Sequence, residues 1–313
     1  MRYRNMISYL PNDESEIEEY RIFSDVVFIV SDIDGTLTRG FEPIGKLIQE
    51  KTDYLKQINV MTTIATGRPY RGAYNVIQQL GITTGTPVVL YNGGVLLEHN
   101  TGCIIKACSI PFCKAQMIVD IVSSCGAGVY VYTYIGNPSD KYSNFNMSKL
   151  YEKVYYTGKL SRKTDINGNC VKSLNFEDMK RENIASILIQ RREITREVID
   201  QLIRYLQSDP KVSYTDSGSG FIEIRTRQTE KSIIIEELRC RFPKDCAQKG
   251  KILAIGDNEN DVDLFKLADI SVAVANSSTL AKKTADYLCK RECAEGYLDM
   301  LRVIENAKRY WKQ

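Results

Sequence analysis

The sequence predicts an α/β fold: a doubly wound, Rossmann-like parallel sheet into which an α+β domain is inserted. Short apolar runs alternate with stretches of helical period in the first hundred residues and again near the end of the chain. This alternation is typical of parallel βαβ units. The middle of the chain differs, because Tyr is frequent there and the polar connections are long. Two similar segments around a different one indicate that one domain interrupts another.

The first segment follows a polar extension, residues 1–24, in which Ile17, Tyr20 and Arg21 predict a short amphipathic helix. Three apolar runs then predict strands, at 26–30, 60–65 and 87–91. The run 26–30 contains only Val, Phe and Ile, which is typical of a strand buried on both faces of a parallel sheet. Apolar side chains at helical spacing predict connecting helices over 43–58 and 70–80.

The middle and last segments complete the predicted elements. In the middle, helices are predicted over 112–124 and 193–207, and strands near 128–135, 170–175, 184–190 and 221–225. The last segment predicts helices over 231–241, 261–267 and 298–311 and strands over 252–255 and 271–274. We therefore predict an N-terminal extension (1–24), a core made of 25–108 and 226–313, and an inserted domain over 109–225.

Composition limits the classes of function. A chain of 313 residues predicts about two domains. A formal net charge of +3 argues against a dedicated nucleic-acid surface. Nine Cys without a CxxC pair predict reduced thiols and a cytoplasmic protein, and no apolar run approaches the roughly 20 residues that span a bilayer. The single histidine, His99, makes a Ser-His-Asp triad or a His-built zinc site improbable. Oligomeric state stays open.

Two carboxylates follow the first predicted strand. Asp32 and Asp34 are two residues apart, so on an extended backbone both point the same way and can face one cation or phosphate. Gly35 allows a sharp turn that presents backbone N–H groups to an anion. A bare Asp-x-Asp is more often an acidic turn that caps a helix. The strand before it and the other strand ends favour the functional reading.

Polar groups also follow the other predicted strands. They are Thr66, Gly67 and Arg68 after the second strand, Lys231 before a helix, and Asp257, Asn258, Asn260 and Asp261 after 252–255. Because a doubly wound sheet gathers its strand carboxyl ends along one edge, we expect these groups to converge. Carboxylates hold Mg²⁺, and Lys and Thr neutralise charge on phosphoryl oxygens, so the set suits phosphoryl transfer. Asp261 can also be a helix N-terminal carboxylate with Asn260 as its cap.

The same residues carry a resemblance to a known family. Segments 32–37, 65–69 and 256–261 resemble motifs one, two and four of the haloacid dehalogenase superfamily. Ile222-Glu223-Ile224 followed by Lys231 resembles motif three of its Cof-type phosphatases, which carry an α+β cap between motifs two and three. Segments 92–94 and 272–276 resemble two further segments of those phosphatases. The similarity spans roughly 26–100 and 220–290.

The resemblance implies a role for each matching residue. Asp32 would be the nucleophile, and Asp34 the general acid and base whose backbone carbonyl faces Mg²⁺. Thr66 and Lys231 would complete the catalytic set. The metal set would be Asp32, Asp34, Asp257 and Asp261, and the substrate-binding set Gly67, Arg68, Asn92, Asn260 and Asn276.

The chain departs from the family pattern at one place. The family often has Pro and Gly between the strand of motif three and its Lys, and Gly after it, whereas Thr226, Gln228 and Ser232 stand there in this chain. The loop before Lys231 is therefore expected to have a different shape. The middle segment has no motif that identifies a substrate, and we interpret its Tyr residues as half-buried strand residues and Arg191-Arg192 as a solvated surface.

These observations favour a Mg²⁺-dependent phosphatase that acts through an aspartyl-phosphate on a small phosphorylated metabolite, for which a sugar phosphate-like molecule is the expected class. A phosphomutase of the same superfamily is the alternative, because spacing alone does not say whether water or a second hydroxyl receives the phosphoryl group. A non-catalytic binding or regulatory protein on the same fold is a third hypothesis, against which the complete set of side chains argues. Phosphate release from any ester separates the enzyme from the binding protein.

Overall fold

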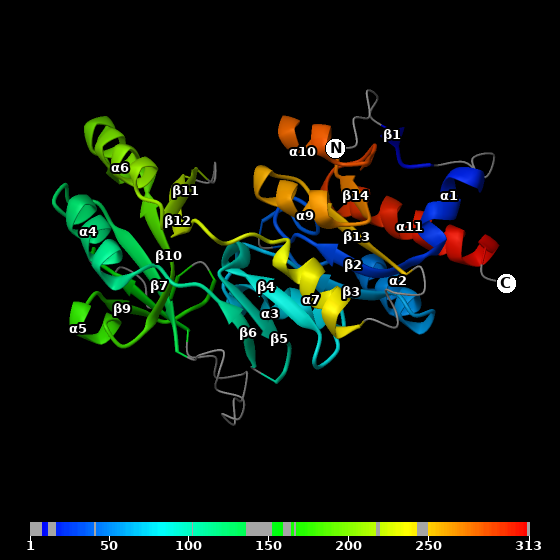
Figure 1. Ribbon diagram of the computed structural model, residues 1–313, viewed down its shortest axis with the longest axis horizontal. Coiled ribbons are helices and arrows are strands. Elements are labelled where there is room, and N and C mark those ends of the chain that lie inside the picture. The colour runs from blue at the N-terminus through cyan, green and yellow to red at the C-terminus, as the bar shows by residue number, and fades with distance from the viewer. Residues whose placement is uncertain are drawn as a thin grey trace. The chain divides into compact units, whose positions relative to one another are not determined.

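A computed structural model describes residues 8–11, 17–40, 42–101, 103–135, 152–158, 164–165, 167–216, 220–242 and 250–311. They group into two compact units (Figure 1). The first comprises the described parts of 1–66, 74–89 and 230–313, and the second comprises those of 67–73 and 90–229. Each unit is described separately below. The domain boundaries given above stay a prediction.

The first unit is built on a parallel sheet of six strands in the order β1-β15-β14-β13-β2-β3. All five neighbouring pairs are parallel. The strands are β1 (Ser8–Tyr9), β2 (Val26–Ser31), β3 (Met61–Ile64), β13 (Lys251–Gly256), β14 (Ile270–Ala273) and β15 (Tyr287–Leu288). β4 (Pro87–Leu90) follows in sequence, and its Val89 forms a parallel bridge with Ala65. The predicted doubly wound parallel sheet is confirmed.

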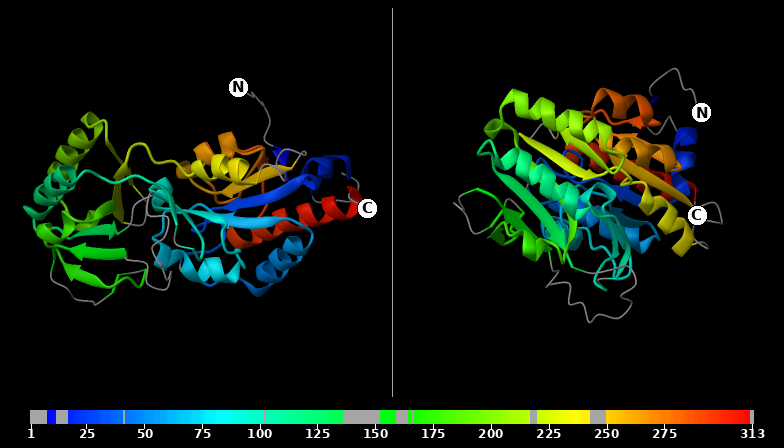
Figure 2. Two further views of the ribbon diagram at one scale, coloured as in Figure 1. Left: turned by 60° about the horizontal axis from the view of Figure 1, so that its bottom comes forward. Right: turned by 60° about the vertical axis from the view of Figure 1, so that its left-hand side comes forward.

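Helices cover both faces of this sheet (Figure 2). On one face lie α2 (Lys46–Gln57) and α11 (Cys293–Trp311), and on the other lie α7 (Ile233–Arg241) and α9 (Val262–Leu267). Because β2 lies between β13 and β3 with helices on both sides, Phe28, Ile29 and Val30 are fully buried. This burial explains the unbroken apolar run in the sequence. The unit also contains α10 (Thr279–Thr284), and α3 (Tyr70–Gln79) connects β3 to β4.

The N-terminal segment is part of the first unit. β1 adds an edge strand beside β15, and α1 (Ile17–Ser24) packs against α11. Phe23 is fully buried, with its ring centroid 5.1 Å from that of Tyr287. The short helix predicted around Tyr20 is confirmed. The structure adds that this segment closes one edge of the sheet and covers α11.

The second unit is built on a six-stranded sheet in the order β11-β12-β10-β7-β8-β9, antiparallel except for the β8–β9 pair. Its strands are β7 (Val129–Tyr134), β8 (Glu152–Tyr156), β9 (Val171–Ser173), β10 (Asn183–Gln190), β11 (Val212–Asp216) and β12 (Phe221–Thr226). α4 (Phe112–Ser123) and α6 (Arg196–Ser208) pack on it through one apolar cluster. The α+β character predicted for the middle of the chain is confirmed.

Alternation along the strands of this sheet separates apolar from polar side chains. Ile222 and Ile224 of β12 belong to the apolar cluster under the helices. Glu223 and Arg225, at the intervening positions, therefore point to the opposite face. β5 (Val95–Glu98) pairs antiparallel with β6 (Ile104–Ala107) in a three-stranded sheet of the order β4-β5-β6, and α5 (Phe176–Met179) is a short helix.

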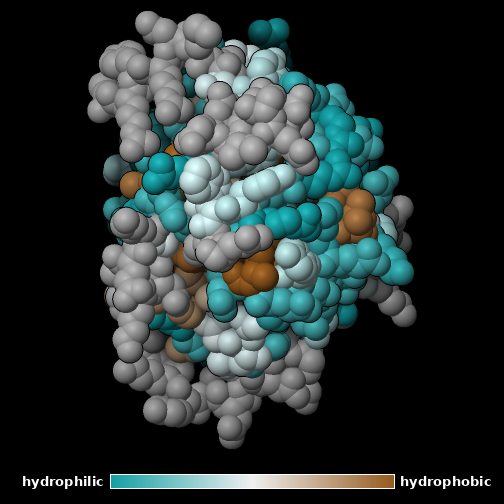
Figure 3. Space-filling model, turned by 90° about the vertical axis from the view of Figure 1, so that its right-hand side faces the viewer, coloured by the Kyte–Doolittle hydropathy of each residue, from teal (hydrophilic) through white to brown (hydrophobic). Residues whose placement is uncertain are grey.

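The surface that faces the viewer in Figure 3 is mostly hydrophilic, with small, separate hydrophobic areas. Within the ranges that the structure describes, no helix combines the length and the apolar composition needed to cross a membrane.

Candidate active site

The loop after β2 is shaped by one glycine. The Asp32 N–H donates to the Ile255 carbonyl (3.0 Å), which extends the β2–β13 pairing to the first carboxylate. The chain then turns at Gly35, whose φ is +84° and whose N–H donates to the Thr38 carbonyl (2.9 Å). A Cβ on Gly35 would lie 2.4 Å from Oδ2 of Asp257. Glycine is therefore required both for the backbone conformation and for the approach of Asp257.

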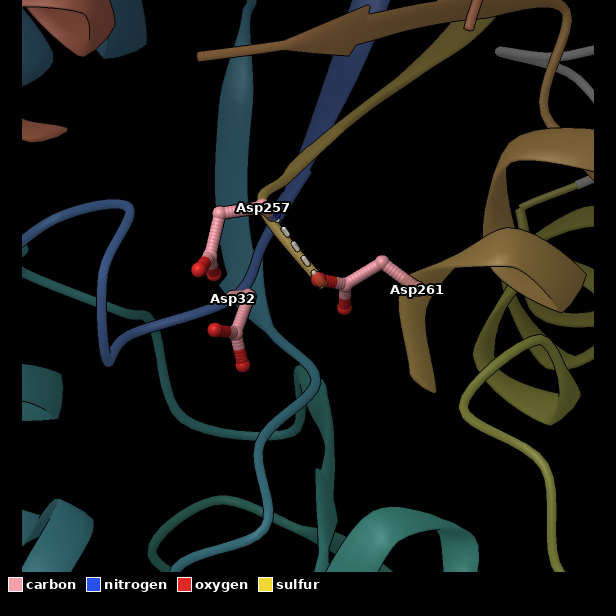
Figure 4. Close-up of side chains that lie close together, drawn as sticks. All are labelled: Asp32, Asp257 and Asp261. Carbon is pink, nitrogen blue, oxygen red and sulfur yellow. Dashed lines mark hydrogen bonds between the residues drawn. The ribbon is translucent and has the colours of Figure 1, made fainter. Parts of the chain in front are cut away.

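Three carboxylates meet at the carboxyl ends of β2 and β13. Asp32, Asp257 and Asp261 each present an oxygen, and these atoms all lie within 4.8 Å of one another (Figure 4). Asp32 is 5% exposed and Asp261 is fully buried. Asp257 also accepts a hydrogen bond from the Thr36 hydroxyl (3.2 Å). The strand ends thus converge as predicted, and they bring Asp32 next to Asp257 and Asp261, which lie more than 200 residues later in the chain.

Lys231 bridges two of these carboxylates. Its Nζ lies 2.7 Å from Oδ1 of Asp32 and 2.7 Å from Oδ1 of Asp261. The lysine side chain is 1% exposed, so both ion pairs are shielded from water. A buried charge pair of this kind needs close partners to offset the loss of hydration. The arrangement therefore fixes where the ammonium group and the Asp32 carboxylate lie.

Asp261 also shapes the loop that carries Asp257. Its Oδ2 accepts hydrogen bonds from the backbone N–H groups of Asp257 (2.9 Å) and Asn258 (3.0 Å). A Cβ on Gly256 would lie 2.5 Å from Cγ of Asp261, so glycine is needed for this carboxylate to approach the backbone. With Lys231 on its other oxygen, Asp261 is held from both sides. Asp261 is therefore a carboxylate at the N-terminus of a helix, which was one of the two interpretations of the sequence, and it is also the ion-pair partner of Lys231.

The charges in this cluster alter the titration of its members. Burial raises the pKa of Asp32 well above its usual range, Asp261 and Asp257 add to the rise, and Lys231 opposes it. Burial, and then Asp261, raise the pKa of Asp257 to about 6, against the effect of Lys231 and Thr36. For Lys231, burial lowers the pKa, but the two carboxylates together raise it above the ordinary value. The lysine is therefore cationic at neutral pH.

The donor set fits a hard divalent cation. Asp32, Asp257 and Asp261 offer only oxygen ligands, which Mg²⁺ prefers. Ionising Asp257 next to Asp261 in a buried place is unfavourable, as its raised pKa records, and a cation would relieve that repulsion. Thr36, whose hydroxyl donates to Asp257, is a member of this cluster that the sequence did not predict as a site residue. It lies in the same motif as Asp34, so the motif was the available signal.

The first unit also places the remaining predicted residues of that segment. Asp34 is exposed at the turn after β2. Thr66 is buried just after β3, and its backbone N–H donates a hydrogen bond to the Val89 carbonyl (3.0 Å). Asn260 is half-buried next to Asp261. Asn276 donates from Nδ2 to the Gly35 carbonyl (2.8 Å) and accepts from the Cys293 N–H (2.8 Å). Asn276 thus ties the Asp34 turn to the start of α11.

Gly67, Arg68 and Asn92 belong to the second unit. Asn92, with a φ of +53°, donates from Nδ2 to the carboxylate of Glu223 (3.1 Å to Oε2). A Cβ on Gly67 would lie 2.9 Å from that Nδ2. Arg68 is buried and donates to the Gly72 carbonyl (3.0 Å). Sequence reasoning did not assign Glu223 a role, although it lies in the segment that resembles motif three.

Comparisons with known proteins show which sequences and folds this chain is similar to. The family model described as haloacid dehalogenase-like hydrolase matches residues 29–301. The phosphoglycolate phosphatase of Methanobrevibacter smithii is 25% identical over 273 residues, which cover 86% of this chain and 94% of that protein. A haloacid dehalogenase-like hydrolase from Bacteroides thetaiotaomicron has a similar structure (TM-score 0.69, 20% identity, 90% of this chain and 98% of the other). The subclass IIB sugar phosphatase BT4131 gives a TM-score of 0.64 at 18% identity over 89% and 97% of the two chains.

Proposed function

This chain belongs to the haloacid dehalogenase-like hydrolases, and on that premise we propose that it is a Mg²⁺-dependent phosphatase that uses Asp32 as its nucleophile. The observation that carries the proposal is the buried Lys231, whose Nζ lies 2.7 Å from both Asp32 and Asp261, with Asp257 beside them. Such a cluster holds one carboxylate oxygen next to fixed positive charge, which suits attack on a phosphoryl group.

The proposed reaction has two displacements at phosphorus. An Asp32 oxygen attacks, the bond to the ester oxygen breaks, and Asp34 gives that oxygen its proton. Asp34 then takes a proton from water, the water oxygen bonds to phosphorus, and the bond to Asp32 breaks to release phosphate. Lys231 holds Asp32 in place and offsets negative charge on the phosphoryl oxygens, to which Thr66 and the Gly67 N–H would donate.

A magnesium ion would be held by oxygens of the metal set: Asp32, Asp34, Asp257 and Asp261. When bound, it would neutralise charge on the phosphoryl oxygens. Because both Asp261 oxygens already accept hydrogen bonds, we propose that this residue acts mainly by holding Lys231 and the Asp257 loop.

The proposed substrate is a small phosphorylated metabolite, with a sugar phosphate as the first class to test. Support comes from the names of similar proteins, which include a phosphoglycolate phosphatase and a sugar phosphatase. Arg68, Asn92, Asn260 and Asn276 are the proposed substrate-side residues beyond the catalytic set.

The test is phosphate release from an aryl phosphate and a panel of phosphorylated metabolites, with wild type and Asp32→Asn, each with Mg²⁺ and with excess chelator. Activity that needs both Asp32 and Mg²⁺ is the expected result. Equal release by both proteins would contradict the assignment of the nucleophile. Phosphate transfer to a second hydroxyl without net release would indicate the mutase instead.

A further inference from the structure

Lys231 lies at the start of a helix, where the backbone lacks some of its usual partners. Ser232, the next residue, is the N-cap of α7. The first N–H groups of a helix have no acceptor four residues back, and the N–H of Ser232 is one of them. A buried N–H of this kind needs an acceptor from another part of the chain. Whatever supplies that acceptor also fixes the peptide that joins Ser232 to Lys231.

Asp263 supplies the acceptor. Its Oδ2 lies 3.0 Å from the Ser232 backbone nitrogen and accepts the N–H. Asp263 is half-buried in the first turn of α9, and α9 packs against α7. Residues 230–313 all belong to the first unit. The hydrogen bond therefore joins the starts of two helices within one compact unit.

The same short segment holds the other end of the lysine. Nζ of Lys231 lies 2.7 Å from Oδ1 of Asp261, two residues before Asp263. Asp261 is fully buried, and its second oxygen accepts backbone N–H groups of its own loop. The segment 261–263 thus holds the ammonium group of Lys231 through one carboxylate and the adjoining peptide through another.

Two points of attachment define the lysine better than one does. The side chain of a lysine is a flexible four-carbon stem, so a contact at Nζ alone leaves its backbone free to move. With the peptide after Lys231 also held, the distance from backbone to Nζ is set by the segment 261–263. Reacting groups that move by about 1 Å can lose on the order of 100-fold in rate. The second point of attachment therefore matters for a reaction that uses this lysine.

We propose that Asp263 is a positioning residue, whose hydrogen bond to the Ser232 N–H keeps Lys231 where its Nζ meets Asp32. This inference rests on the phosphatase function proposed above, in which Lys231 holds the nucleophile and offsets charge on the phosphoryl oxygens. In the described contacts, Asp263 bonds to neither Asp32 nor Nζ of Lys231. It acts through the peptide at the start of α7.

The kinetic test separates the hydrogen bond of Asp263 from its charge. Burial raises the pKa of Asp263, and the bond from Ser232 and then the charge of Lys231 oppose the rise, so a charge effect needs its own variant. Asp263→Asn keeps an oxygen acceptor without the charge, and Asp263→Ala removes both. Asp263→Glu keeps the charge but displaces the acceptor by one methylene group, and it keeps the proposal testable if Asp263→Ala does not fold.

We expect Asp263→Ala to lower kcat about 10- to 100-fold, with KM changed less than about threefold. Asp263→Asn should keep kcat within about threefold of wild type, and Asp263→Glu should lose more than Asp263→Asn does. Phosphate release measures all three. If Asp263→Asn loses as much kcat as Asp263→Ala or Asp263→Glu, the charge is responsible and the proposal is overturned. A rise in KM alone would also overturn it, because it would indicate contact with substrate.

Asp286→Ala is the matched control for the loss of a backbone acceptor. Asp286 is also half-buried in the first unit, and its Oδ2 accepts the Ser271 N–H (3.1 Å) and the Ser271 hydroxyl (2.9 Å). No described contact joins Asp286 to Lys231. We expect thermal melts to show that Asp286→Ala is destabilised while its kcat stays at the wild-type value. A kcat loss as large as that of Asp263→Ala would attribute the effect to general destabilisation and overturn the proposal.

A second readout does not depend on turnover. Acetic anhydride labelling followed by peptide mass spectrometry reports the exposure of Lys231, with the buried Lys308 as an internal reference for global unfolding. We expect Asp263→Ala to raise Lys231 labelling at least about threefold with Lys308 unchanged, and Asp286→Ala to leave Lys231 labelling at the wild-type level. Unchanged Lys231 labelling in folded Asp263→Ala would overturn the proposal.

Failure of this inference is separable from failure of the proposed function. If wild type releases no phosphate, the function fails, while the labelling comparison still reports on the attachment of Lys231. If wild type is active and Asp32→Asn is not, the Asp263 variants test the positioning role alone.

Discussion

Asp257 shows how burial and charge act on a single residue of the site. Its pKa is raised to about 6 by burial and by Asp261, although Lys231 and Thr36 oppose the rise. A carboxylate whose pKa is higher in the folded state binds a proton more tightly when folded. The contribution of Asp257 to the free energy of unfolding of the metal-free protein therefore falls as pH rises from about 4 to about 6.

Replacing Asp257 should remove its contribution to this dependence. At pH 7.5 without metal, we expect Asp257→Asn to be more stable than wild type by about 1 to 3 kcal/mol, with the difference vanishing near pH 4. Mg²⁺ should raise the melting temperature of wild type but not of Asp257→Asn. Urea unfolding and thermal melts measure both effects. Glu259→Gln, at an exposed position in the same loop, should behave as wild type; a Mg²⁺ response retained by Asp257→Asn would contradict the assignment of Asp257 to the metal.

At the residue scale, the sequence predicted which charged residues belong to the site but not how they pair. Asp32, Asp257 and Lys231 were predicted from strand ends and motif spacing, and the structure brings them together. The structure shows that both carboxylate oxygens of Asp261 accept hydrogen bonds and that Glu223 accepts one from Asn92. These bonds depend on side-chain directions that are set by packing. Spacing in the sequence does not contain that information.

At the scale of elements, two glycines after β2 allow the effect of backbone strain to be measured apart from the effect of a steric clash. Gly35 and Gly40 both have positive φ (+84° and +68°). A Cβ on Gly35 meets Asp257, whereas one on Gly40 has nothing within 4 Å. The two glycines therefore form a matched pair in the same loop region.

We expect Gly40→Ala to lose about 1 kcal/mol of stability, because it places a side chain at positive φ, and Gly35→Ala to lose more, because its Cβ also meets Asp257. Only Gly35→Ala should also lose phosphatase activity, by at least about tenfold, because it displaces Asp257. Thermal melts and phosphate release with Mg²⁺ measure the two effects. Equal activity losses in the two variants would show that strain, and not the contact with Asp257, is responsible.

Long, strongly patterned elements were predicted well and short ones were not. β2 and the helices α2, α3 and α4 lie within a few residues of the predicted ranges. β1 and β15 contain two residues each, so no apolar period could mark them. β8, at Glu152–Tyr156, is not among the strands predicted for the middle segment, because its pairing with β7 and β9 supplies the order that its own pattern lacks.

At the scale of the whole molecule, the predicted architecture of a doubly wound core and an α+β segment is confirmed, while the N-terminal segment had no assigned purpose. The structure packs α1 on α11 and places Phe23 in the core beside Tyr287. Such contacts between distant parts of the chain leave little trace in local sequence. The segment therefore stabilises the first unit rather than the site itself.

Phe23→Ala should lower the free energy of unfolding by about 3 to 5 kcal/mol, because it leaves a cavity in a fully buried place. Its kcat and KM, measured at a temperature where the variant is folded, should match wild type. Tyr9→Ala, at a side chain that is 53% exposed, should change stability by no more than about 0.5 kcal/mol. A large kinetic effect of Phe23→Ala would connect the segment to catalysis.

The phosphorylation of Asp32, on which the proposed reaction depends, can be observed directly. Asp34→Asn incubated with p-nitrophenyl phosphate and Mg²⁺ should accumulate the phosphoenzyme, because this leaving group needs little acid assistance while water lacks its base. Acid quenching and borohydride reduction then convert an aspartyl-phosphate to homoserine, which peptide mass spectrometry locates. We predict homoserine at position 32, dependent on substrate and absent in Asp32→Asn with Asp34→Asn. Homoserine at another carboxylate, or hydrolysis without any at position 32, would contradict the account.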